Sequence, residues 1–103
     1  MTGSSPSDLA VAFRSFPRRA DAIRRRADET GRRAAVDAEL DSLNAVVARA
    51  ARRVGAAPDP ESVAVKILAV SPSEWQNSGL AELRQDALDA GRALRQAEAL
   101  AEG

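Results

Sequence analysis

The sequence predicts a small all-α protein, a helical bundle of three to four helices. Apolar residues recur every three or four positions along two long segments, which is the spacing of one face of a helix. Signals for helix starts and ends flank these segments. The composition agrees, because 45% of the residues are hydrophobic but only 3% are aromatic, and alanine, the best helix former, is abundant. At 103 residues we expect a flexible N-terminus over 1–5 and a single helical domain over 6–103.

A short first helix is expected near 8–16. Its apolar residues fall on one helical face, and Phe13 and Phe16 are the largest of them. Pro17 follows directly. Because proline has no backbone N–H and restricts the residue before it, the sequence predicts that this helix ends or kinks there.

A long helix is expected over about 18–54. Its second half carries a heptad seam with alternating steps of four and three, formed by Val36, Leu40, Leu43, Val47, Ala50 and Val54. Gly31 lies where the apolar register of the first half meets that of the second, so a break or bend around 30–32 is left open. Gly55 stands where a helix C-terminus favours glycine, with Arg52 and Arg53 in the last turn.

A second short helix is expected near 60–70. Asp59 is a typical N-cap residue, Pro60 suits the first helical position and Glu61 places an acid in the first turn. The β-branched residues that follow also permit a strand. The start signal favours the helix.

The second long helix is expected over about 80–101, after a capping box at Ser71–Glu74. It carries a heptad seam of smaller residues, formed by Leu80, Leu83, Ala87, Ala90, Leu94, Ala97 and Ala101. We expect the two long helices to pack antiparallel at about 20°, with the larger residues of one seam against the smaller residues of the other. The short helices would cover the open sides.

The missing residue types narrow the function. The chain has no histidine, cysteine or tyrosine, and Lys66 is its single lysine. These types supply most acid–base chemistry, most covalent nucleophiles and most transition-metal ligands, so we expect no enzyme, no cofactor and no metal. We also expect a cytoplasmic protein, because there is no cysteine for disulfides, no secretory signal over 1–8 and no apolar run of membrane-spanning length.

The segment 14–33 is the sharpest charged feature, with eight arginines and three acidic residues. One interpretation is a solvated or protein-binding face, since acids precede arginines by four residues, as in Asp21–Arg25. The other is a face for nucleic-acid phosphates. Interleaved acids and the lack of aromatics among the arginines make this second interpretation weaker. The candidate interaction residues here are Arg18, Arg19, Arg24, Arg25, Arg26, Arg32 and Arg33.

Trp75 is the only tryptophan and completes the set of candidate interaction residues. It follows the capping box directly. A core residue that closes one end of the bundle is one interpretation, and a partner-facing anchor is the other, because tryptophan is enriched at binding hot spots.

These observations predict a non-enzymatic helical module for protein–protein interaction, with a regulatory or adaptor role. We expect it to form a homodimer along one of the two seams, with the basic early helix of one copy beside the acidic C-terminal half of the other. The alternative is a nucleic-acid-associated protein that uses the Arg-rich segment 14–33. No membrane partner is expected.

Overall fold

Four helices account for almost all of residues 6–70 and 77–102, which are the residues that the computed structural model describes. They are α1 (Pro6–Thr30), α2 (Arg33–Val54), α3 (Pro60–Ala69) and α4 (Asn77–Glu102). No strand occurs among these residues. The predicted all-α class is therefore confirmed.

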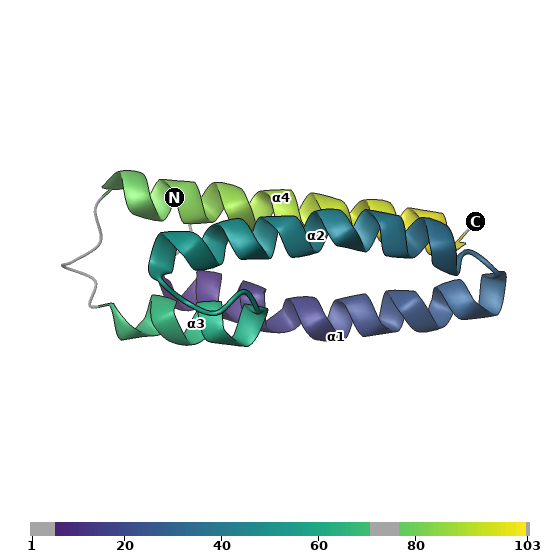
Figure 1. Cartoon of the computed structure of the whole chain (residues 1–103), viewed down its shortest axis with the longest axis horizontal. Coiled ribbons are helices and arrows are strands. Elements are labelled where there is room, and N and C mark those ends of the chain that lie inside the picture. Colours follow the sequence, from purple (N-terminus) through teal and green to yellow (C-terminus); the bar gives the residue numbers. More distant parts are fainter. Residues whose placement is uncertain (1–5, 71–76, 103) are drawn as a thin grey trace.

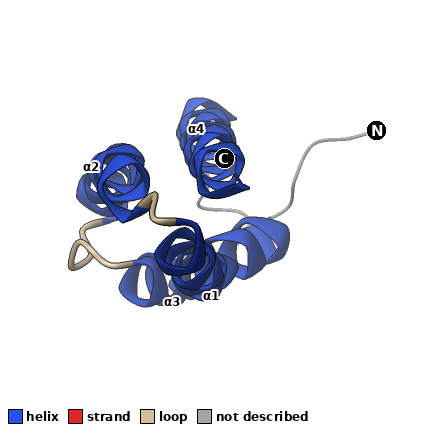
Figure 2. Ribbon diagram, turned by 90° about the vertical axis from the view of Figure 1, so that its right-hand side faces the viewer, coloured by secondary structure: helices blue, strands red, loops and turns tan. Residues whose placement is uncertain are grey.

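The helices form an elongated bundle of 47 × 30 × 17 Å (Figure 1). The helix α2 runs antiparallel to α4, as predicted for the two seams, and α1 runs in the same direction as α4. Seen along the bundle, α1, α2 and α4 stand at the corners of a triangle, and the short α3 lies beside α1 (Figure 2). The described part of the bundle thus contains three long helices, whereas the sequence predicted two.

The helix α1 continues through Pro17, so the prediction of a separate helix near 8–16 is wrong. Its buried face crosses the proline without interruption, and consists of Leu9, Ala10, Phe13, Phe16, Ala20, Ile23 and Ala27. Burial of this face compensates for the hydrogen bond that Pro17 cannot donate to the carbonyl of Phe13. The N-terminal part of α1 leaves the line of the rest of the helix (Figure 2), and proline is the usual cause of such a bend.

The predicted helix over 18–54 is two helices, because the chain reverses at Gly31. Gly31 has φ +73°, a left-handed conformation that glycine adopts without steric cost. The N–H of Arg32 donates to the carbonyl of Ala27 at 2.9 Å, the bond that closes a Schellman turn. The open question of a break at 30–32 is thereby settled: α1 and α2 form a helical hairpin with a two-residue turn.

The start of α3 forms as the sequence predicts. The carboxylate of Asp59 accepts hydrogen bonds from the Ser62 N–H at 2.9 Å and from the Ser62 hydroxyl at 2.8 Å. These bonds lower the pKa of Asp59, the backbone N–H contributing most. The helical interpretation of 60–70 is confirmed against the strand alternative.

The heptad seams form the centre of the core. On α2, Val36, Leu40, Leu43, Val47 and Ala50 are buried and Val54 is partly buried. The small residues of α4 lie against them, with Leu83, Ala90, Leu94, Ala97 and Ala101 buried. Phe13 and Phe16 of α1 add the only large aromatic volume in the described core, with ring centroids 5.2 Å apart in an edge-to-face arrangement. Among the described helices, none has the length and apolar content needed to cross a membrane.

Candidate functional site

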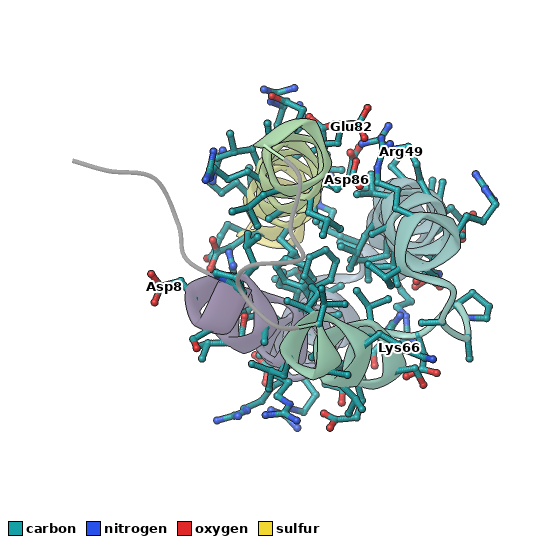
Figure 3. All side chains as sticks on the ribbon, turned by 90° about the vertical axis from the view of Figure 1, so that its left-hand side faces the viewer. Asp8, Arg49, Lys66, Glu82 and Asp86 are labelled. Carbon is teal, nitrogen blue, oxygen red and sulfur yellow. The ribbon has the colours of Figure 1, made fainter. Side chains whose placement is uncertain are left out.

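One charged side chain is completely buried between α2 and α4. Asp86 has an exposed fraction of 0%, and it faces Arg49 across the two helices (Figure 3). Its Oδ1 accepts a hydrogen bond from Arg49 Nε at 2.7 Å, and its Oδ2 accepts one from Arg53 Nε at 2.7 Å. Two guanidinium groups one helical turn apart thus neutralise a single carboxylate.

Two further acids of α4 extend this cluster toward the surface. Arg49 Nη2 donates to Asp89 at 2.6 Å, and Arg53 Nη1 lies 3.3 Å from a carboxylate oxygen of Glu82. The bond from Arg49 lowers the pKa of Asp89 and raises the pKa of Arg49 itself. The hydrogen bonds thus favour the ionised forms of Asp89 and Arg49, and the cluster acts as a tie between α2 and α4.

Sequence reasoning missed this tie. Neither the arginines nor the carboxylates of the tie were among the candidate residues. The available signal was the spacing, because Arg49 and Arg53 lie one turn apart on α2 and Glu82, Asp86 and Asp89 lie one turn apart on α4.

Three of the seven candidate arginines form ion pairs within the chain. Arg24 contacts Asp21 at 3.1 Å, Arg26 contacts Glu29 and Glu102 at 3.3 Å each, and Arg33 contacts Asp28 at 2.9 Å and Asp37 at 3.0 Å. The i,i+4 pairs expected from sequence, such as Asp21–Arg25, do not form. Asp21 and Glu29 pair instead with arginines three residues away, and Asp28 pairs with an arginine five residues away.

The other four candidate arginines are exposed and carry no ion pair or side-chain hydrogen bond to any part of the chain that the structure describes. They are Arg18, Arg19, Arg25 and Arg32. Arg19 differs from the others in its position, since it lines a groove of about 280 Å³ between α1 and α4 together with Ile23 and Glu98. Trp75, the eighth candidate, lies outside the described residues.

The charge asymmetry of the chain is largely satisfied within it. Acids of α4 pair with arginines of α1 and α2, through Arg26–Glu102 at one end and the Asp86 cluster at the other. Both heptad seams are likewise buried against each other. A second copy would consequently have to bind through another surface, and not along either seam as the sequence suggested.

Exposed apolar side chains lie on the outer sides of α1 and α3. Val65 and Leu68 are 49% and 46% exposed and lie three residues apart on one face of α3. Val11 of α1 is 67% exposed. An ion pair of 3.2 Å between Arg14 and Glu61 connects the two helices. Val11 lies one turn before Arg14 on α1, and Val65 lies one turn after Glu61 on α3. We name Val11, Val65 and Leu68 the α1/α3 apolar patch.

The residues of this patch lie off the apolar faces that the sequence predicts. Val11 falls off the face that Phe13 and Phe16 define, and Val65 falls off the face of Val63 and Ile67. That mismatch is the sequence signal for the patch.

No group of three or more metal-ligating side chains is found within 6–70 and 77–102. Comparison of the chain with known protein families, with curated proteins and with solved structures finds no match. Within the described residues, the fold and the surface define a small bundle of four helices with an apolar patch on one side and a buried ionic tie on the other.

Proposed function

We propose that the protein is a non-enzymatic interaction module that self-associates as a homodimer through the α1/α3 apolar patch. The observation that carries the proposal is the exposure of three branched apolar side chains on two helices that an ion pair holds together. Burial of such side chains in an interface removes apolar surface from water, which is the main source of association free energy.

The charges around the patch favour a second copy as its occupant. Arg14 and Glu61 place one positive and one negative charge beside the apolar side chains. Two copies related by a two-fold axis can then place Arg14 of each beside Glu61 of the other, so the surface is self-complementary. The formal net charge of the chain is zero, so the two copies do not repel each other overall.

Sedimentation equilibrium at low micromolar concentration tests the proposal. The wild type is expected to be a dimer in low and high salt, because apolar contacts are not screened by ions. The double substitution Val65→Lys/Leu68→Lys keeps good helix formers on α3 and is expected to give a monomer.

Leu88→Lys is the matched control, since Leu88 is 60% exposed on α4, outside the patch. It is expected to remain a dimer, and circular dichroism checks that each variant is folded. A wild type that is monomeric in both salts would refute the dimer, and so would a double variant that dimerises like the wild type.

A cytoplasmic location belongs to the same proposal, supported by the absence of cysteine from the sequence. Cell fractionation with an antibody to the native protein tests it. Recovery with the membrane or secreted fraction would contradict it.

A further inference from the structure

Three acids of α1 are each engaged by a nearby arginine. Asp21 is held by Arg24, Glu29 by Arg26 and Asp28 by Arg33. These ion pairs offset the negative charges of the three acids. The arginines of α1 that make no ion pair with the described residues therefore keep an uncompensated positive charge.

Arg18 and Arg25 carry that charge on one line of α1. They are seven residues apart, which is two helical turns or about 10.5 Å along the axis, and both are exposed. Arg32 lies in the turn after α1, where the chain reverses, and so does not continue this line. We name Arg18 and Arg25 the α1 arginine row.

We propose that the α1 arginine row docks an acidic amphipathic helix whose carboxylates recur every seven residues. A partner helix lying along α1 presents residues seven apart at the same interval of about 10.5 Å, so carboxylates in this pattern meet Arg18 and Arg25 in register. Charge complementarity of this kind sets the partner and its orientation. This inference goes beyond self-association, because it uses other residues and a different partner.

The pattern of charges favours a helix over a nucleic acid. Asp21 and Asp28 stand on the outward side of α1 between and beyond the arginines of the row. A continuous phosphate backbone would pass close to both carboxylates, whereas a helix can place neutral or basic residues opposite them. Phe13 and Phe16 are buried, so they offer no surface on which bases could stack.

Fluorescence anisotropy with three labelled probes tests the proposal. The first is a helical peptide with glutamate at every seventh position, the second has the same composition with the glutamates out of register, and the third is duplex DNA of about 20 base pairs. The in-register peptide is expected to bind most tightly, and its affinity should fall when the salt concentration is raised.

Arg18→Glu/Arg25→Glu is expected to weaken binding of the in-register peptide at least about tenfold. The matched control is Arg52→Glu/Arg95→Glu, which makes the same change in net charge at exposed arginines of α2 and α4 that have no ion-pair partner among the described residues. The control is expected to stay within about twofold of the wild type.

Three results would overturn the proposal. They are equal losses in the two double variants, equal binding of the two peptides, and tighter binding of DNA than of the in-register peptide. Circular dichroism shows whether each variant is folded.

Discussion

Asp86 of α4 and Arg49 of α2 are 37 positions apart in the sequence and are joined by a 2.7 Å hydrogen bond between Oδ1 and Nε. The carboxylate is buried, while the side chains of Arg49 and Arg53 are 40% and 33% exposed. The two sides of this tie thus differ in their access to water. Loss of the arginines strands a buried charge, whereas loss of the carboxylate leaves two guanidinium groups that can be solvated.

The first prediction concerns this asymmetry. Arg49→Met/Arg53→Met is expected to lower the free energy of unfolding by about 3–5 kcal/mol, because Asp86 then stays buried without a counter-charge. Asp86→Leu is expected to cost less than about 2 kcal/mol, since the guanidinium groups reach water and Arg49 keeps Asp89. Urea denaturation measures both. A greater loss for Asp86→Leu than for the double variant would contradict the role given to burial here.

The second prediction compares two glycines. Gly31→Ala forces a side chain into a left-handed conformation at φ +73°, and is expected to cost about 1–2 kcal/mol although no atom lies within 4 Å of the new Cβ. Gly91→Ala lies inside α4, where the nearest atom is the flexible Arg95 Nη1 at 3.4 Å, and is expected to stabilise by about 0.5–1 kcal/mol. Thermal or urea unfolding gives the sign of each change, and two changes of the same sign would be inconsistent with these backbone roles.

The third prediction concerns the seam. Leu43→Ala and Leu83→Ala remove buried side chains from the α2–α4 interface and are each expected to lower the free energy of unfolding by about 2–4 kcal/mol. Leu88→Ala, an exposed site on the same helix as Leu83, is expected to change it by less than about 0.5 kcal/mol. If Leu83→Ala matched Leu88→Ala in a urea titration, Leu83 would have to lie outside the core.

The fourth prediction is a pH dependence at the start of α3. The pKa of Asp59 is lower in the folded chain than in the unfolded one, so its ionisation stabilises the fold above the ordinary aspartate pKa of about 3.9. That contribution is lost as the pH falls through the lower, folded value. Asp59→Ser keeps an N-cap oxygen but does not titrate.

The free energy of unfolding of the wild type is accordingly expected to exceed that of Asp59→Ser near pH 6. The difference should narrow as the pH is lowered below about 4. Urea titrations at a series of pH values measure it. A difference that stays constant down to pH 2 would show that the Asp59 carboxylate is not stabilised by its bonds to Ser62.

Local signals predicted the parts of the fold that local chemistry decides. Asp59 with Pro60 marked the start of α3, Gly55 marked the end of α2, and the heptad steps identified the buried faces of α2 and α4. Pro17 was predicted to end or kink the helix. The helix bends but continues, because burial against α3 and α4 outweighs the local cost of the proline. Helix propensity alone carries no information about that packing.

The candidate site was predicted less well, since pairing of charges is a tertiary property. Arg26 and Arg25 are adjacent in the sequence, yet only Arg26 lies close to Glu102, 76 residues away. Burial of Asp86 depends equally on where α2 places Arg49 and Arg53. Identification of the free arginines required the arrangement of all three long helices.

The small residues of the α4 seam limit how this chain can diverge. Ala90 and Ala97 are completely buried against the larger residues of α2, so a larger side chain at either position would push the two helices apart. Exposed arginines of α1 that make no ion pair within the described part of the chain, such as Arg25, can by contrast change without disturbing this packing. A homologue would therefore keep small residues at 90 and 97, an acid at 86 with two basic residues one turn apart on α2, and glycine at 31 and 55. That short pattern, rather than overall sequence identity, is what would identify distant relatives of this protein.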